Sequence, residues 1–402
     1  MRLIRTEAEL VALASGLRSE PLLAVDTEAA SFHRYLDRVY LLQISSREET
    51  AVVDPLATGG LGPIGELLTD PAIEIVFHDA DYDLRLLNRE YGYTAKHLFD
   101  TRIAAQLLNE AGVGLAALLE KYLGIRLDKR FQRADWSARP LSPEMLEYAA
   151  SATRDLPQLR DLLRQMLEYA ASDTRYLPQL RDLLRQLLEE RGRLGWAQEE
   201  FALLEDIRPT PPDQAEPGWL RVKGAKALRG RELAIFRELW EWRDGAARRA
   251  DRATFRILNN EPMLTMAKNP PTELTALKAI PGVSSDQAER RGRELLAAVR
   301  RGLELPETDL PKLTRPPRRV PDLAYEERLE RLKAARNRLA QECDLAPGVI
   351  CPNGTLEAIA RLDPKTTAEL SGVTELRRWQ LREFGEELFK GLRGTAARDG
   401  AG

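Results

Sequence analysis

The stretch PLLAVDTEA, residues 21–29, is an apolar run that ends in the carboxylates of Asp26 and Glu28. Similar apolar runs recur at 40–46, 51–55 and 73–80, and helix-like segments lie between and after them at 64–70 and 81–92. Short strands that are apolar throughout and alternate with helices are typical of a sheet covered on both faces. Residues 20–110 are therefore predicted to form an α/β domain.

The chain beyond Thr101 is predicted to be almost entirely helical, and two proline-rich joints interrupt it. Proline cannot continue a helix and favours an extended spacer, so each joint predicts a domain boundary. The two helical blocks share a weak likeness, because each opens with a long charged helix and reaches a Gly-Val step before its last helix. The predicted segments are a first domain (1–207), a linker (208–218), a first helical domain (219–303), a second linker (304–321), a second helical domain (322–395) and a tail (396–402).

Length and composition narrow the class of protein. A chain of 402 residues with a net charge of −3 suits two to three domains. It has no uncharged apolar stretch near the roughly 18 residues of a membrane span. Its two cysteines, Cys343 and Cys351, are too few for a disulfide framework, and with only three histidines a His/Cys zinc site is not expected. We expect a soluble, cytoplasmic, monomeric protein whose chemistry depends on carboxylates.

A tandem repeat follows the α/β segment. MLEYAASATRDLPQLRDLLRQ (145–165) is followed at once by MLEYAASDTRYLPQLRDLLRQ (166–186), and 19 of the 21 positions are identical. The copies differ in having Ala152 against Asp173 and Asp155 against Tyr176. Because only the second copy has an acid, Asp173, where the first has Ala152, the second copy is the better candidate for a functional role.

Acidic side chains stand at the ends of several predicted elements. Asp26 and Glu28 are one residue apart on a strand and therefore point to the same face. Asp83 begins a predicted helix, and Tyr169 and Asp173 share one face of another. Each alone is an ordinary strand end, helix start or packing pair. Brought together at one end of a sheet, the acids would repel one another unless divalent cations neutralised them, and hard oxygen ligands suit Mg²⁺ or Mn²⁺.

Three motifs in this order carry a resemblance: DTE after a strand, H-x-A-x-x-D from His78 to Asp83, and Y-x-x-x-D from Tyr169 to Asp173. They resemble the motifs of the DEDD superfamily of 3′–5′ exonucleases, in its tyrosine subclass. Segments similar to those of ribonuclease D occur at 98–108, 127–150 and 219–224. Both helical blocks resemble the HRDC domain. The resemblance implies an α/β, ribonuclease H-like exonuclease domain with a mixed sheet, followed by two small all-α HRDC domains.

The resemblance also implies a reaction. Two divalent ions, Mg²⁺ or Mn²⁺, would support hydrolysis of the 3′-terminal phosphodiester, releasing 5′-mononucleotides from RNA with a free 3′ end such as tRNA precursors. Asp26 would bridge both ions, and Glu28 and Asp173 would hold the ion that activates water. Asp83 would help to hold the second ion, and Tyr169 would orient or deprotonate the water. The alternatives are a DNA-directed exonuclease and a nucleic-acid-binding protein with an impaired exonuclease site.

The duplication departs from the family, which has one Tyr–Asp helix. The first copy stands at the expected place, because Tyr148 follows Trp136 by 12 residues, yet Ala152 occupies its acid position. A continuous helix would displace the second copy by about 31 Å and rotate it by about 60°, so both copies cannot serve one site. In the alternative that we favour, the first copy is looped out, and Tyr169 and Asp173 enter the site. In the other alternative, the first copy fills the site, which then lacks one metal ligand.

Other polar residues near the motifs have simpler interpretations. Asp100 precedes a helical run and is predicted to be its N-cap rather than a metal ligand. His78 is expected to pack or to form a hydrogen bond. His33 and Tyr35 follow the first motif in a loop, and nothing in the sequence fixes them at a substrate.

A basic segment at 219–256 is the candidate nucleic-acid surface. It contains eleven Lys and Arg against five acids, which suits phosphate contact, and its tryptophans are expected in the core more readily than against bases. The residues predicted to contact nucleic acid are Arg221, Lys223, Lys226, Arg248 and Arg249. The second helical domain has a net charge of −1, which favours packing on the first domain or on a partner.

Overall fold

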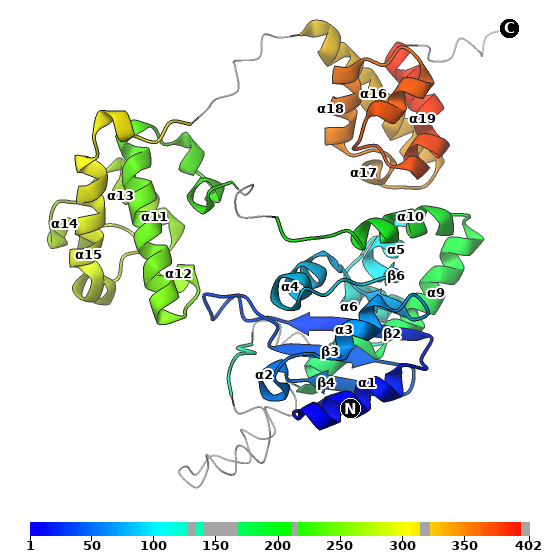
Figure 1. Cartoon of the computed structure of the whole chain (residues 1–402). Helices are drawn as coiled ribbons and strands as arrows, with labels where there is room; N and C mark the ends of the chain where they lie inside the picture. The colour runs from blue at the N-terminus through cyan, green and yellow to red at the C-terminus, as the bar shows by residue number, and fades with distance from the viewer. Residues whose placement is uncertain (128–133, 140–166, 211–215, 314–321, 395–402) are drawn as a thin grey trace.

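The computed structural model describes residues 1–127, 134–139, 167–210, 216–313 and 322–394. Its N-terminal part contains a six-stranded sheet with the strand order β1-β4-β3-β2-β5-β6 (Figure 1). The strands are β1 (Arg2–Ile4), β2 (Leu22–Glu28), β3 (Leu41–Ser45), β4 (Thr50–Val53), β5 (Glu74–Phe77) and β6 (Leu98–Asp100). β3 is antiparallel to β2 and β4, and the other neighbours are parallel. The sheet is therefore mixed, as the resemblance implied.

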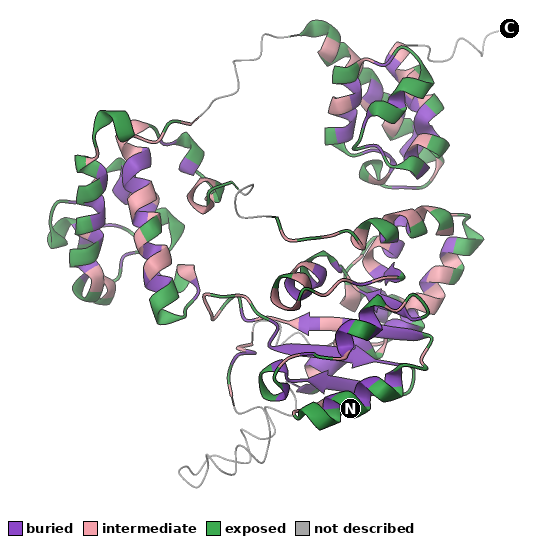
Figure 2. Cartoon of the chain, viewed as in Figure 1, coloured by how far each residue is buried: buried purple, intermediate pink, exposed green. Residues whose placement is uncertain are grey.

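Helices cover both faces of this sheet. β3, β4 and β5 are buried along their whole length (Figure 2). The covering helices are α1 (Glu7–Leu17), α2 (Pro55–Thr58), α3 (Ile64–Thr69), α4 (Asp81–Tyr91), α5 (Thr101–Leu107), α6 (Leu115–Leu123), α9 (Leu177–Glu190) and α10 (Leu194–Leu204). Residues 167–175 are also helical and lead into α9. The predicted α/β class is confirmed by this arrangement.

Local sequence explains where several of these elements begin and end. Thr6 and Glu9 form a capping box at the start of α1. Gly92, at a φ of 71°, ends α4 in the left-handed conformation that glycine adopts without steric cost. Pro178 lies in the first turn of α9, where a missing backbone N–H is tolerated. The helix of residues 167–175 and α9 are consequently two separate elements.

The four strands β2, β3, β4 and β5 match the predicted apolar runs, whereas β1 and β6 were not predicted. Both of these edge strands are only three residues long. A pattern of period two cannot be recognised in so short a segment. Their pairing with β4 and β5 therefore depends on the sheet that is already present.

Two helical domains follow, and each contains the long charged helix that the sequence predicted, α11 in the first and α16 in the second. The first contains η1 (Gly218–Arg221), η2 (Ala225–Ala227), α11 (Gly230–Ala250), α12 (Thr254–Ile257), α13 (Asn260–Lys268), α14 (Leu274–Lys278), α15 (Ser285–Glu304) and η3 (Glu307–Asp309). The second contains α16 (Leu323–Glu342), α17 (Pro347–Ile350), α18 (Asn353–Leu362), η4 (Thr367–Gly372) and α19 (Arg378–Arg393). In the first domain α11 packs on α15, and in the second α16 packs on α19. None of the described helices is long and apolar enough to cross a membrane.

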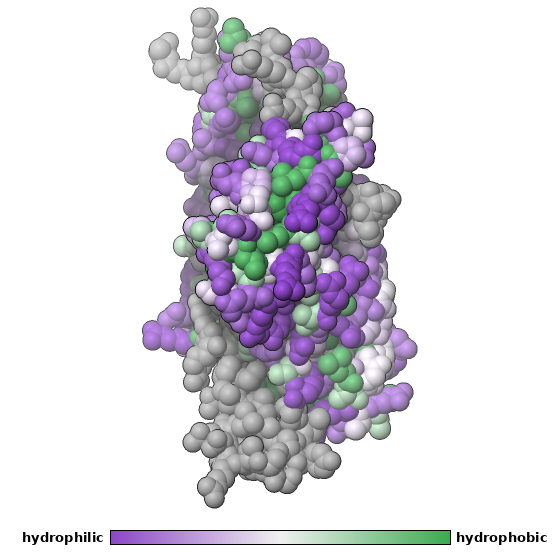
Figure 3. Space-filling model, turned by 90° about the vertical axis from the view of Figure 1, so that its left-hand side faces the viewer, coloured by the Kyte–Doolittle hydropathy of each residue, from purple (hydrophilic) through white to green (hydrophobic). Residues whose placement is uncertain are grey.

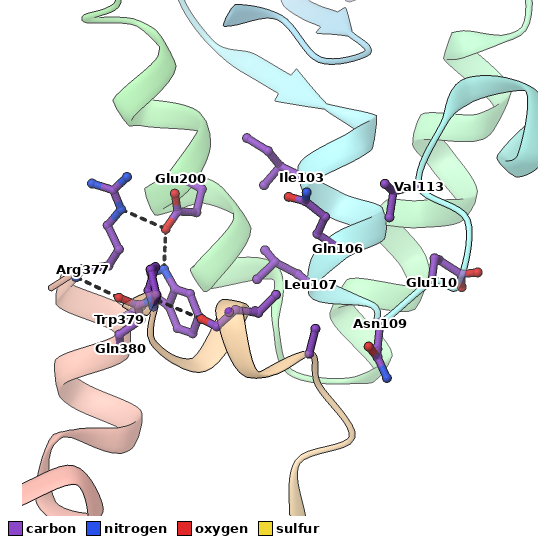
Figure 4. Close-up of a pocket in the computed structure, with 14 residues that line it drawn as sticks. Ile103, Gln106, Leu107, Asn109, Glu110, Val113, Glu200, Arg377, Trp379 and Gln380 are labelled. Atoms are coloured by element: carbon purple, nitrogen blue, oxygen red, sulfur yellow. Dashed lines mark hydrogen bonds and ion pairs between the residues drawn. The ribbon is translucent and has the colours of Figure 1, made fainter. Parts of the chain in front are cut away.

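The second helical domain packs on α10 of the sheet domain. The rings of Trp196 and Trp379 stack with centroids 4.7 Å apart, and Trp379 Nε1 donates to Glu200 Oε1 at 2.8 Å. Arg377 forms an ion pair with the same carboxylate at 3.4 Å. A cavity of about 440 Å³ remains beside this seam, between α5, α10 and α19 (Figure 4). The expectation that this domain packs on the first domain is met.

Candidate active site

Three carboxylates meet at the end of β2. Asp26 and Glu28 project from this strand, and Asp173 projects from the helix of residues 167–175. Each contributes one carboxylate oxygen to a group in which all the oxygens lie within 4.8 Å of one another. Charges of the same sign at this distance raise one another's pKa unless cations balance them.

Asp83 lies beside this group, in the first turn of α4, and is 6% exposed. Thr27 Oγ1 donates a hydrogen bond to Asp83 Oδ1, which ties the start of α4 to β2. Burial, followed by the charge of Asp26, raises the pKa of Asp83 well above its usual value. Asp83 is outside the group of three oxygens but within electrostatic reach of it. The four acids that the sequence singled out are therefore all gathered at one end of the sheet.

The acids of this cluster hold protons more tightly than ordinary carboxyls. Burial and the neighbouring charge of Asp173 raise the pKa of Asp26 to about 8, and burial raises the pKa of Asp173 to about 7. Burial and the charges of the other acids raise the pKa of Glu28 well above its usual value. A buried set of carboxylate oxygens that repel one another is a donor set suited to hard divalent cations such as Mg²⁺ or Mn²⁺. The residues thus fit the group that the resemblance implies.

The helix of residues 167–175 is held on the sheet by packing and by one hydrogen bond. Ala170 and Ala171 are buried in a cluster with Leu41 of β3 and Trp136, and their small side chains allow the helix to lie close to the strands. Thr174 Oγ1 lies 2.7 Å from Ser45 Oγ, also on β3. These contacts fix the height and rotation of the helix, and therefore where its polar side chains point.

Tyr169 and Asp173 are the Tyr–Asp pair that the structure brings to β2. Both line a cavity of about 430 Å³ together with Asp26 and His78. The ring of Tyr169 stacks on the buried ring of Trp136, with centroids 6.2 Å apart and planes 18° from parallel. The first copy of the repeat, with Tyr148 and Ala152, lies outside the described residues.

Asp100 and His78 have the structural roles that the sequence suggested. Asp100 is the N-cap of α5, and its carboxylate also accepts hydrogen bonds from the backbone N–H groups of Asp79 and Ala80 at 3.2 and 2.8 Å. His78 Nδ1 lies 2.9 Å from Thr101 Oγ1, and burial lowers the pKa of His78 to about 4. The imidazole is therefore neutral and engaged in a hydrogen bond.

The loop that follows Glu28 is clasped by the first helical domain, which sequence reasoning missed. Tyr35 Oη donates to Asp244 of α11 at 2.9 Å, and Arg248 lies over the Tyr35 ring at 5.4 Å. Arg256 Nε donates to the backbone oxygen of Phe32 at 2.7 Å, and Ala253 N donates to that of His33 at 3.3 Å. We call residues 29–39 the clasped loop. No local sequence pattern predicts these contacts, because they join residues more than 200 positions apart.

All of the predicted nucleic-acid-binding residues are exposed, but three of them contact other residues of the protein. Lys223 and Arg249 are exposed. Arg221 donates to the backbone oxygen of Glu216 at 2.8 Å, Lys226 forms an ion pair with the same residue at 2.7 Å, and Arg248 contacts the clasped loop. The three tryptophans of this segment pack against the domain core, as expected. Figure 3 shows this side of the molecule, on which hydrophilic residues surround a smaller hydrophobic area.

The acidic cluster predicts a characteristic pH dependence of stability. A carboxyl whose pKa is higher in the folded than in the unfolded chain stabilises the fold while it is protonated. For Asp26 this contribution is lost as the pH rises from the usual value of 3.8 to about 8. We therefore expect the thermal midpoint in EDTA to fall over this range, and an excess of Mn²⁺ to restore it most at the alkaline end.

Differential scanning fluorimetry at several pH values measures this effect. The Asp26→Asn variant is the control, since its side chain has no proton to lose and its midpoint in EDTA should decline less steeply. If the midpoint of the unchanged protein is constant or rises over this pH range, the buried acids do not have the raised pKa values described above.

Comparisons with known proteins agree with this geometry. A family model described as 3′–5′ exonuclease matches residues 1–189, and the HRDC domain model matches residues 232–299 and 326–392. The chain is 32% identical to ribonuclease D of Gluconacetobacter diazotrophicus over 96% of this chain and 91% of the relative. It is 30% identical to ribonuclease D of Escherichia coli K12 over 77% of each chain. The crystal structure of Escherichia coli RNase D, described as an exoribonuclease involved in structured RNA processing, superposes with a TM-score of 0.68 at 26% identity, covering 98% of this chain and 99% of that one.

Proposed function

Because this chain belongs to the ribonuclease D family, with a 3′–5′ exonuclease domain and two HRDC domains, we propose that it removes nucleotides one at a time from the 3′ end of RNA. The observation that carries the proposal is the convergence of Asp26, Glu28 and Asp173, with Asp83 beside them, at one end of the sheet. Its proposed substrates are RNAs with a free 3′ end, structured RNAs such as tRNA precursors among them.

We assign the cluster the following chemistry. Bound Mg²⁺ or Mn²⁺ supplies positive charge that lowers the pKa of water and stabilises the leaving oxygen. Asp26 would contact two such ions, Glu28 and Asp173 would hold one of them, and Asp83 would help to hold the other. Tyr169, which lines the same cavity, would orient the attacking water or take its proton. The water oxygen would form a bond to the last phosphorus while the bond from that phosphorus to the preceding 3′ oxygen breaks. The 3′ oxygen would take up a proton from solvent water, which leaves a 5′-mononucleotide and a shortened chain with a 3′ hydroxyl.

The direct test is nucleotide release from an RNA labelled at its 5′ end. We expect a ladder that shortens one nucleotide at a time in Mg²⁺ or Mn²⁺ and no shortening in EDTA. An otherwise identical RNA with a 3′ phosphate is the control for direction, and a DNA of the same sequence tests the preference for RNA. Faster cleavage of the DNA would favour the DNA-directed alternative. Binding of either strand without metal-dependent release would favour a protein with an impaired site.

The first helical domain is the proposed RNA-binding surface. Lys223 and Arg249 are exposed cations of this domain. The clasped loop, which follows Glu28 directly, joins this domain to the strand that carries Asp26 and Glu28. Phosphate contacts from these cations would guide a single-stranded 3′ end towards β2.

Removing both cations is expected to weaken RNA binding in a salt-dependent manner. Each phosphate contact with a single strand contributes about 0.7 to the slope of log affinity against log salt. The double variant Lys223→Ala/Arg249→Ala should therefore have a slope that is shallower by about 1.4. Fluorescence anisotropy in EDTA, at several salt concentrations, measures it without cleavage.

The matched control for this experiment is Arg361→Ala/Arg378→Ala, which removes two exposed cations from the second helical domain. Its slope should equal that of the unchanged protein. If the two double variants have the same slope, Lys223 and Arg249 do not contact phosphate.

A further inference from the structure

Gln43 is a buried amide with no partner. It lies in the middle of β3 and is 0% exposed. Neither Nε2 nor Oε1 of this side chain has a hydrogen-bond partner among the described residues. A buried amide that makes no hydrogen bond lowers stability, so a residue of this kind invites a functional explanation.

The register of the sheet places Gln43 directly opposite Asp26. In the antiparallel ladder between β2 and β3, Asp26 pairs with Gln43, and on the other side of β3 Gln43 pairs with the apolar Val52. Side chains of directly opposed residues lie on the same face of a sheet, with their Cβ atoms about 5 Å apart. The side chains of Gln43 and Asp26 therefore leave the same face of the sheet as direct neighbours across the ladder.

The polar neighbour two residues along the same face of β3 is already satisfied. Ser45 exchanges hydrogen bonds with Thr50 and Thr174, and this contact anchors the helix of residues 167–175. Its register partner on β2 is Ala24, which offers no side-chain polar atom. Across the ladder, Asp26 is the polar side chain opposed to Gln43.

We propose that Gln43 is a positioning residue for the metal-bound form of Asp26. Its Nε2 would donate to the Asp26 oxygen that faces β3, and so hold the carboxylate in the orientation that presents its other lone pairs to a divalent ion. Hydrogen bonds to metal-binding side chains commonly have this effect. A neutral amide can do so without adding a further negative charge to four acids. The inference rests on the proposed function, because it concerns the same metal site.

The test compares two glutamine-to-leucine variants in the full chain. Gln43→Leu removes two unsatisfied polar atoms and should raise the thermal midpoint in EDTA, yet weaken Mn²⁺ binding by about 10- to 100-fold. Gln380→Leu is the matched control. Gln380 is also buried, but its amide donates to Val349 O at 2.9 Å and accepts from Arg377 N at 3.1 Å. This variant should lower the midpoint and leave the Mn²⁺ affinity unchanged.

Isothermal titration calorimetry with Mn²⁺ alone measures the affinity independently of RNA cleavage. A Gln43→Leu variant that binds Mn²⁺ as tightly as the unchanged protein would overturn the inference. If that variant does not fold, Gln43→Met, which is unbranched and of similar length, provides the same comparison with the same two outcomes. Normal Mn²⁺ binding by the unchanged protein without RNA cleavage would count against the proposed function alone, since the effect of Gln43 on affinity would still be measurable.

Discussion

Replacing Asp26 by asparagine is expected to abolish nucleotide release and at the same time to stabilise the metal-free protein. Asp26 belongs to the cluster, and burial, together with the charge of Asp173, raises the pKa of its carboxyl to about 8. Asparagine removes a charge that divalent ions need and that the neighbouring acids oppose. Because metal ions contribute several kcal/mol to such transition states, the rate should fall by at least about a thousandfold.

Single-turnover release of mononucleotides from labelled RNA measures the rate, and thermal unfolding in EDTA at about pH 8, the pKa of Asp26, measures the stability. Asp100→Asn is the control, since Asp100 is also a buried carboxyl but caps α5. That variant should lose stability and keep most of its activity. Near-full activity of Asp26→Asn in Mg²⁺ or Mn²⁺ would remove Asp26 from the proposed site.

Deleting residues 145–165 is expected to preserve or raise activity, whereas Asp173→Ala should eliminate it. The structure brings Asp173 to Asp26 and Glu28, so the second copy of the repeat has the acid that the cluster uses. The deletion shortens the spacing between Trp136 and Tyr169 from 33 to 12 residues, which is the spacing that Tyr148 has in the full chain.

Ala152→Asp in the full chain separates the two copies. If the second copy serves the site, this substitution should leave the rate unchanged, because position 152 takes no part in it. If the first copy serves the site, the unchanged protein should be weak and Ala152→Asp should rescue it. Activity that survives Asp173→Ala would assign the site to another acid.

The fold and the acids of the site could be predicted from local patterns. The runs that became β2 to β5 are apolar because both of their faces are buried, so the composition of each run reflects its position. The two-residue spacing of Asp26 and Glu28 placed them on one face without any knowledge of the sheet. The mixed character of the sheet came from the resemblance, and the order of the strands was not predicted, because apolar runs do not specify their neighbours.

The rest of the site depends on contacts between distant segments. Gln43 follows Asp26 by 17 residues, and only the antiparallel register shows that the two are opposed. The bond between Ser45 and Thr174, which orients the helix of residues 167–175, spans 129 positions. Such pairs leave no periodic pattern in the sequence, because neither partner differs from other polar residues in strands or helices.

The clasped loop has a consequence for the way such proteins can be recombined. Its backbone continues directly from Glu28, while its side chains and carbonyl groups are bound by Asp244, Ala253 and Arg256 of the first helical domain. In a chimaera that takes this domain from a relative, the clasped loop would face a surface that lacks its matching partners. The loop lies only a few residues from Asp26 and Glu28 in the sequence. The transferable unit is therefore the domain together with residues 29–39, two segments that are far apart in the gene and must be inherited as a matched pair.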